Sequence, residues 1–222
     1  MRVLVAGVDE AGRGCVIGPL VVAGVMIKEE KLPVLARLGV KDSKLLSAKK
    51  REALAVEIAG LAEKHVTVKL LPVEIDRAVE SGRKLHKLNR LEAQTMAKII
   101  EALKPDEAFV DAADVLEERF RQHIQEGLSF KAKIIAEHKA DKTYVVVSAA
   151  SIIAKVERDK EIATLTDEYG DFGSGYLADS RTTRFLKQWL QAHDEYPDCV
   201  RKSWKPAKRA KNEQGSVQKK LA

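Results

Sequence analysis

The sequence predicts an α/β fold in which helices flank a mixed five-stranded sheet. Two observations carry this prediction. The chain opens with two valine-rich runs on either side of a glycine-rich turn, and its later apolar runs alternate with helical patterns. With 222 residues, 45% of them hydrophobic and 32% charged, the chain is long enough to bury the core of one globular domain.

The first two strands are expected near the N-terminus, over 2–8 and 16–27. Both runs are rich in β-branched residues, which favour strands. Glycines lie between the two runs, so we expect an antiparallel pair. Asp9 follows the first run directly and is expected to end that strand.

A helix and a third strand are expected next. Leucine and isoleucine recur at helical spacing over 47–64, and a serine caps this segment. Alternating apolar and polar residues predict a strand over 65–71, which Pro72 stops. A long helix is expected over 83–103, because its apolar positions form a stripe that ends before Lys104-Pro105.

The last two strands are expected over 108–111 and 144–147, because each is a short apolar run followed by a helical pattern. Strands that are joined through helices pair in parallel, whereas the opening pair is antiparallel. The predicted sheet is therefore mixed.

The C-terminal part is expected to form a helical cap, with a helix over 180–193. We expect one domain over 1–206, divided into a core over 1–172 and a cap over 173–206. Large apolar residues are almost absent over 207–222, which is predicted to be a flexible basic tail.

The formal net charge of +6 favours an anionic partner such as nucleic acid, although a solvated basic tail explains much of it equally well. The two cysteines, Cys15 and Cys199, have neither metal-ligand nor disulfide spacing, which fits a reducing cytoplasm. The longest apolar run, 15–27, is too short to span a bilayer. We therefore expect a cytoplasmic monomer without a membrane partner.

Four acidic residues stand at or beside the ends of predicted strands, where α/β sheets place their ligand sites: Asp9, Glu10, Asp111 and Asp141. Gathered carboxylates repel one another unless cations neutralise them, and hard oxygen ligands suit Mg²⁺ or Mn²⁺. Two such ions can activate a water and stabilise the leaving oxygen of a phosphodiester. Each aspartate alone is better explained as a turn or helix cap, but the set favours metal-dependent hydrolysis.

The triplet Gly12-Arg13-Gly14 follows the first two carboxylates. Its glycines let the backbone approach a ligand closely, and the arginine offers a planar fork to a phosphate or sugar oxygen. A tight hairpin turn with an exposed arginine explains the triplet equally well by itself.

Further blocks follow these motifs along the chain: Gly18-Pro19-Leu20, Lys41-Asp42-Ser43-Lys44, Phe109-Val110-Asp111, the run from Val146 to Lys155, Gly173-Ser174-Gly175-Tyr176, and Lys202-Ser203-Trp204-Lys205. Together with Gly7 to Gly14, the set resembles ribonuclease HII, the type 2 ribonuclease H family, and its archaeal branch in particular. The resemblance extends from residue 2 to about residue 205 in the family's order.

The resemblance implies a ribonuclease-H-like fold and an endonuclease that cuts the RNA strand of RNA/DNA hybrids and single ribonucleotides embedded in duplex DNA. It implies 5′-phosphate and 3′-hydroxyl products, and roles in primer removal and ribonucleotide repair. The residues that would bind two Mg²⁺ or Mn²⁺ ions and carry catalysis are Asp9, Glu10, Asp111 and Asp141.

For substrate binding, the resemblance implies that Gly12, Arg13 and Gly14 read the ribose 2′-hydroxyl, while Tyr176 packs on the sugar of the following deoxynucleotide. Further candidate substrate ligands are Lys44, Ser148, Lys155 and Arg158. Ser148 is equally explained as part of a helix start, and the last two as solvent-facing helix residues.

Parts of the sequence also fit two other activities and one protein partner. Ribonuclease HIII shares the chemistry, but its members usually carry an extra N-terminal domain. A non-catalytic hybrid-binding protein would gain nothing from carboxylates beside phosphates. The tail segment Gln218-Lys219-Lys220-Leu221 matches only the first half of the sliding-clamp-binding motif of archaeal relatives, so the clamp is a candidate partner through an incomplete motif.

Overall fold

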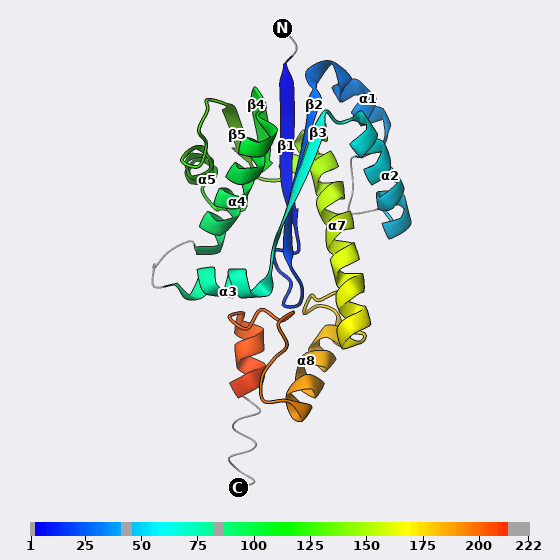
Figure 1. Ribbon diagram of the computed structural model, residues 1–222, viewed down its shortest axis with the longest axis vertical. Coiled ribbons are helices and arrows are strands. Elements are labelled where there is room, and N and C mark those ends of the chain that lie inside the picture. The colour runs from blue at the N-terminus through cyan, green and yellow to red at the C-terminus, as the bar shows by residue number, and fades with distance from the viewer. Residues whose placement is uncertain (1–2, 41–45, 82–86, 213–222) are drawn as a thin grey trace. The chain divides into compact units, whose positions relative to one another are not determined.

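The computed structural model describes residues 3–40, 46–81 and 87–212 (Figure 1). The chain forms two compact units, which we call the sheet unit and the helical unit. The sheet unit comprises Met1–Ala11, Val21–Lys69 and Lys84–Glu157, and the helical unit comprises Gly12–Leu20, Leu70–Arg83 and Arg158–Ala222. Each unit therefore gathers segments that are distant in sequence, whereas the expected core and cap follow the order of the chain.

The strands are β1 (Leu4–Ala11), β2 (Leu20–Lys28), β3 (Lys64–Leu70), β4 (Glu107–Asp111) and β5 (Lys133–Glu137). The helices are η1 (Glu29–Lys31), α1 (Leu32–Arg37), α2 (Ala48–Leu61), α3 (Pro72–Glu80), α4 (Lys87–Leu103), α5 (Glu117–Gln125), α6 (Ala140–Thr143), α7 (Val145–Tyr169) and α8 (Ser180–Ala192). The strand order is β3-β2-β1-β4-β5. β1 pairs antiparallel with β2 and parallel with β4, and β4 pairs parallel with β5, which confirms the mixed five-stranded sheet.

The opening antiparallel pair is confirmed, but β1 does not end at Asp9. The register runs from Leu4 opposite Lys28 to Ala11 opposite Val21, so Asp9 and Glu10 are both paired with β2. An acidic residue does not stop a strand when the ladder of backbone hydrogen bonds continues through it.

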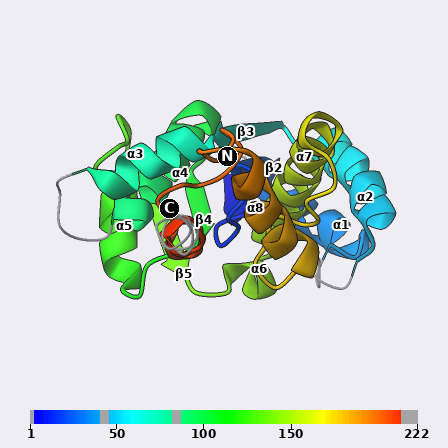
Figure 2. The ribbon, with the colours of Figure 1, turned by 90° about the horizontal axis from the view of Figure 1, so that it is seen from below.

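Two glycines allow helices to pack closely on the two faces of this pair. A Cβ on Gly7 would lie 2.3 Å from the backbone of Val146 in α7, and a Cβ on Gly24 would lie 2.3 Å from Ile99 in α4. Figure 2 shows α4 and α7 on opposite sides of β1 and β2. Since side chains alternate along a strand, Asp9 lies on the same face as Gly7, which is the face of α7.

The prediction of the last strand was wrong. Residues 144–147 are not a strand; from Val145 onward they form the first turn of α7, and β5 lies earlier, at Lys133–Glu137. A short apolar run fits a buried helix as well as a buried strand. Val146 and Val147 are buried in the core as part of a long helix, whereas β5 has only five residues and therefore a weak pattern.

Several predicted helices are confirmed. Ser47 caps α2, accepting a hydrogen bond of 3.3 Å from the Lys50 amide. Pro72 ends the third strand as expected, but it also begins α3, a helix that the sequence pattern did not predict. Among the described residues, no helix has the length and apolarity that a membrane span needs.

The helical unit has its own apolar core, which includes Phe172 and Leu186 and against which Trp189 packs. The predicted helix after residue 180 is confirmed as α8, and Asp179 caps it by accepting from the Arg181 amide. Residues 205–212 are also helical, and Ala207 is buried, so the described part of the expected flexible tail, 207–212, belongs to a helix. The remainder, 213–222, lies outside the described residues.

Candidate active site

Asp9 is the most buried of the predicted carboxylates and the centre of the candidate site. It lies in β1 with 4% of its surface exposed. The Glu10 amide donates to its Oδ1 at 2.7 Å, and the Ser151 hydroxyl of α7 donates to its carboxylate. Glu10 follows in the same strand with a half-buried side chain.

The groups around Asp9 shift the pKa of its carboxyl. The pKa of Asp9 is raised to about 7, mainly by burial and also by the negative charges of Asp111 and Asp141, while hydrogen bonds from the Ser151 hydroxyl and the Glu10 amide oppose the rise. The sheet unit therefore brings three of the predicted carboxylates into electrostatic contact. A cation placed among them would remove the repulsion and favour the ionised form of Asp9.

Asp111 and Asp141 reach this site from two neighbouring segments. Asp111 is the last residue of β4, whose parallel pairing with β1 sets Val110 opposite Val8. The Asp111 carboxylate accepts a hydrogen bond of 2.8 Å from the Ala140 amide at the start of α6, the helix that carries Asp141. Asp111 thus does act as a cap, and this capping positions the next carboxylate.

Helix α7 contributes polar side chains to the same site. The Ser148 hydroxyl donates to the backbone carbonyl of Asp141. The Lys155 ammonium donates to the Ser151 hydroxyl at 2.9 Å, one helical turn away. Lys155, Ser151 and Asp9 therefore form a chain of contacts, which places the lysine charge one residue away from the buried carboxylate.

The chemistry of this donor set fits a hard divalent cation. Its donors are carboxylate oxygens, which suit Mg²⁺ and Mn²⁺ better than Zn²⁺. Within the ranges that the structure describes, no three acidic, histidine or cysteine side chains form a metal cage by themselves. Mg²⁺ commonly uses only one or two carboxylates and completes its shell with water and substrate phosphates. The repulsion at Asp9 is what such an ion would relieve.

The helical unit contains the Gly12-Arg13-Gly14 turn. Gly12 has a φ of +87°, and a Cβ there would lie 2.5 Å from Nε of Arg158 and 2.6 Å from the Pro19 carbonyl oxygen. Only glycine therefore fits at this position. Arg13 is half-buried and Gly14 is exposed.

Tyr176 and Arg158 lie together beside this turn. The Arg158 guanidinium is 4.8 Å from the centre of the Tyr176 ring and donates to the Ser174 carbonyl oxygen at 2.9 Å. Burial raises the pKa of Tyr176, while the Gly12 amide and the Arg158 charge oppose the rise. Arg158 is only 6% exposed, so it is not the solvent-facing residue that the helical pattern allowed.

Arg201 is the residue that sequence reasoning missed. It belongs to none of the predicted site motifs, but it is fully buried in the helical unit. Its guanidinium contacts the backbone carbonyls of Gly12, Arg13 and Gly18. The sequence carries no signal for this, because the contacts join residues more than 180 positions apart.

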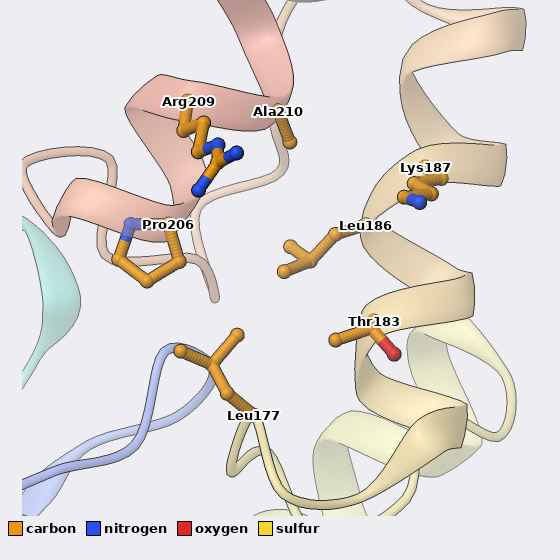
Figure 3. A pocket seen from close by; sticks show the side chains of 7 residues that line it. All are labelled: Leu177, Thr183, Leu186, Lys187, Pro206, Arg209 and Ala210. Atoms are coloured by element: carbon orange, nitrogen blue, oxygen red, sulfur yellow. The ribbon is translucent and has the colours of Figure 1, made fainter.

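A pocket of about 300 Å³ lies in the helical unit, beside α8 and the 205–212 helix (Figure 3). Its lining is mainly apolar with two cationic side chains: Leu177, Thr183, Leu186, Lys187, Pro206, Arg209 and Ala210. No predicted site residue lines this pocket. Of those residues, Lys44 lies outside the described part of the chain.

Comparison with known proteins is consistent with this geometry. Residues 6–207 match the family described as Ribonuclease HII. The chain is 47% identical to Ribonuclease HII of Thermococcus onnurineus, over 97% of this chain and 93% of the relative. It is 48% identical to Ribonuclease HII of Archaeoglobus fulgidus, over 90% of this chain and 93% of the relative.

Solved structures show the same fold. Ribonuclease H2 from Pyrococcus horikoshii superposes with a TM-score of 0.87 at 42% identity, covering 95% of this chain and 98% of the other. The ribonuclease HII of a PCNA complex from Archaeoglobus fulgidus superposes with a TM-score of 0.83 at 45% identity, covering 91% and 96%. Bst-RNase HIII in complex with Mn²⁺ shares the fold at 24% identity, with a TM-score of 0.77 and coverage of 94% and 69%.

Proposed function

This chain belongs to the ribonuclease HII family and is a metal-dependent endoribonuclease of the ribonuclease H type, and we propose that it cuts both RNA/DNA hybrids and single ribonucleotides embedded in duplex DNA. Its products would carry 5′-phosphate and 3′-hydroxyl ends. Such cleavage serves primer removal and ribonucleotide repair.

The observation that carries the catalytic part is the buried Asp9 with Asp111 and Asp141 around it. We propose that these residues, with Glu10, would hold two Mg²⁺ or Mn²⁺ ions. When bound, the ions supply Lewis-acid activation of water and of the scissile phosphate. Ser151 orients the Asp9 carboxylate through its hydroxyl, and Lys155 orients Ser151.

The recognition part is assigned to the helical unit. The turn at Gly12, Arg13 and Gly14 would contact the ribose 2′-hydroxyl, the group that distinguishes RNA from DNA. Tyr176 would pack on the sugar of the following deoxynucleotide. The contact of Arg158 with the Tyr176 ring and with the Ser174 carbonyl supports this assignment, because it fixes the ring beside the turn. Ser148, Lys155 and Arg158 remain candidate phosphate ligands.

The test is cleavage of two labelled duplexes, one with a single ribonucleotide and one with a continuous RNA strand, in EDTA, Mg²⁺ and Mn²⁺. We expect no cleavage of either duplex in EDTA and cleavage of both with either ion, each cut breaking a P–O3′ bond to give one 5′-phosphate end and one 3′-hydroxyl end. Full activity in EDTA would contradict the metal assignment, and cleavage of only the continuous hybrid would contradict the junction assignment.

The two alternative activities are less well supported. The ribonuclease HIII structure shares the fold alone at 24% identity, whereas the family match covers 6–207 as ribonuclease HII. A pure binding protein would not need a buried carboxylate facing two others, since each repels the phosphates of its ligand.

The sliding clamp is a second candidate partner, because the Archaeoglobus fulgidus relative was solved in complex with PCNA. The Gln218 to Leu221 segment, which lies outside the described residues, carries the first half of a clamp-binding pattern. Gel filtration of PCNA with the full chain and with a chain ending at residue 212 tests this. If the full chain co-elutes with PCNA and the shortened chain does not, binding through the tail is supported. If neither chain co-elutes with PCNA, the clamp is excluded as a partner.

A further inference from the structure

Arg201 has no exposed surface, and its guanidinium lies under the glycine turn of the helical unit. Burying this cation is costly unless its N–H groups find acceptors. The acceptors belong to one loop: Nη2 donates to the Gly12 carbonyl at 2.6 Å and to Cys15 Sγ at 2.9 Å, Nη1 to the Arg13 carbonyl at 2.9 Å, and Nε to the Gly18 carbonyl at 3.1 Å. One side chain therefore joins the start of the loop to its end.

Hydrogen bonds and a ring contact also hold the segment that carries Arg201 in place. The Asp76 carboxylate accepts from the Lys202 amide at 2.8 Å and from the Ser203 amide at 3.0 Å. The Trp204 ring lies 5.0 Å from the guanidinium carbon, and the Arg201 amide donates to the Val16 carbonyl at 2.9 Å. The guanidinium is thus held in one place and one orientation, as positioning requires.

The geometry of the peptide bonds determines which way the backbone amides of the turn point relative to Arg201. In a trans peptide the carbonyl and the following N–H point in opposite directions, and no cis peptide occurs in the described ranges. Because Arg201 binds the carbonyls of Gly12 and Arg13, the amides of Arg13 and Gly14 point away from it. A cation bound to a carbonyl also polarises the peptide, which strengthens its N–H as a donor.

We propose that Arg201 is a positioning residue for ribonucleotide recognition: it holds the turn so that the amides of Arg13 and Gly14 face the ribose 2′-oxygen. This inference rests on the proposed function, in which the turn reads the 2′-hydroxyl. The planar fork matters as much as the charge, since a lysine ammonium is a single point that cannot match carbonyls spread over the loop in the same way.

The experiment compares binding to two duplexes that differ by one 2′-hydroxyl. Each variant is made in an Asp111→Asn background, so that the substrate is not cut, and its affinities for a duplex with one ribonucleotide and for the all-DNA duplex are measured. We expect the affinity ratio to fall about tenfold in Arg201→Lys and up to about a hundredfold in Arg201→Met, as when an outer-shell partner is lost. Affinity for the all-DNA duplex should be retained, because phosphate contacts do not read the sugar.

Lys202→Met is the matched control. It removes the neighbouring cation, whose ammonium pairs with Asp198 at 3.4 Å on the surface, and should leave the ratio unchanged. If Arg201→Met does not fold, Asp76→Asn provides a second test. It weakens the hydrogen bonds that the Lys202 and Ser203 amides donate to Asp76, so the segment next to Arg201 is held less firmly and the affinity ratio should fall a few-fold.

The affinity ratio of the variants tests the role of Arg201, and the ratio of the parent protein tests the proposed function of the turn. A folded Arg201→Lys protein that keeps the parent ratio would overturn the inference, and so would equal losses on both duplexes, which indicate a merely structural role. A parent protein that binds both duplexes equally would instead show that the turn does not read the 2′-hydroxyl, and both proposals would fall together.

Discussion

The two compact units gather charge in opposite ways. In the sheet unit, Asp111 and Asp141 add negative charge around the buried Asp9, and its hydrogen-bond donors, the Ser151 hydroxyl and the Glu10 backbone amide, are neutral groups. In the helical unit, the cations of Arg158 and Arg201 are buried and bind backbone carbonyls. The first arrangement calls for cations from outside the protein, while the second already contains its own. We infer that the sheet unit binds metal and that the helical unit holds a rigid recognition surface.

The strongest test of this contrast is Asp111→Asn. Losing a carboxylate should weaken ion binding and remove several kcal/mol of transition-state stabilisation, which is about a thousandfold in cleavage rate. Affinity for the hybrid should remain, because the helical unit is unchanged. Glu107→Gln, at the other end of β4 and in a surface pair with Lys133, is the control and should cut normally. Comparable rates in both variants would remove Asp111 from the metal site.

Gly7→Ala tests whether the carboxylate site depends on the seating of α7. A Cβ there would lie 2.3 Å from the Val146 backbone, so the helix that carries Ser151 must shift. Overpacking of this kind costs about 1–3 kcal/mol, which lowers the melting temperature by roughly 5 °C in a chain of this size. Cleavage should fall while the preference for a ribonucleotide stays.

Gly60→Ala is the matched control for that measurement. Gly60 lies in α2 with no atom within 4 Å of an added Cβ, so alanine should stabilise the helix by up to about 1 kcal/mol. A Gly7→Ala protein as stable as the parent would show that α7 is not seated as described.

Tyr176→Ala tests the recognition surface without touching the carboxylates. Loss of ring packing is worth about 1–3 kcal/mol, so cutting at a single embedded ribonucleotide should fall about tenfold or more, and cutting of a long hybrid should fall less. Tyr176→Phe keeps the ring over Arg158 and should retain most activity. Equal losses on both substrates would remove the junction-sensing role of Tyr176.

Asp114→Asn is expected to have the smallest effect and tests a carboxylate that needs no metal. Asp114 lies three residues after Asp111, and hydrogen bonds from Arg119 hold its pKa well below the usual range. A lowered pKa contributes stability above the unfolded value near pH 4, and this stability is lost as the pH falls below it. The variant should be about 1 kcal/mol less stable than the parent in urea at pH 7, with little difference at pH 2, and should still cut. A constant difference at both pH values would contradict this.

Local patterns were sufficient for much of the fold. Glycines and β-branched runs predicted the antiparallel pair, and Ser47 predicted the start of α2, because strand pairing across a turn and helix capping depend on neighbouring residues. The apolar run at 144–147 predicts a strand but belongs to the start of α7, since a run of four residues has no period that separates strand from helix.

The sequence by itself determined the chemistry of the candidate site: which carboxylates are present, that their oxygens suit a hard cation, and that a glycine turn follows them. Only the tertiary structure decided the environment of each group. It buried Asp9, made Asp111 a cap for the helix of Asp141, and placed Arg201 beneath a turn more than 180 residues away. Burial and long-range contacts are properties of the packed chain, because they depend on which distant segments exclude water together.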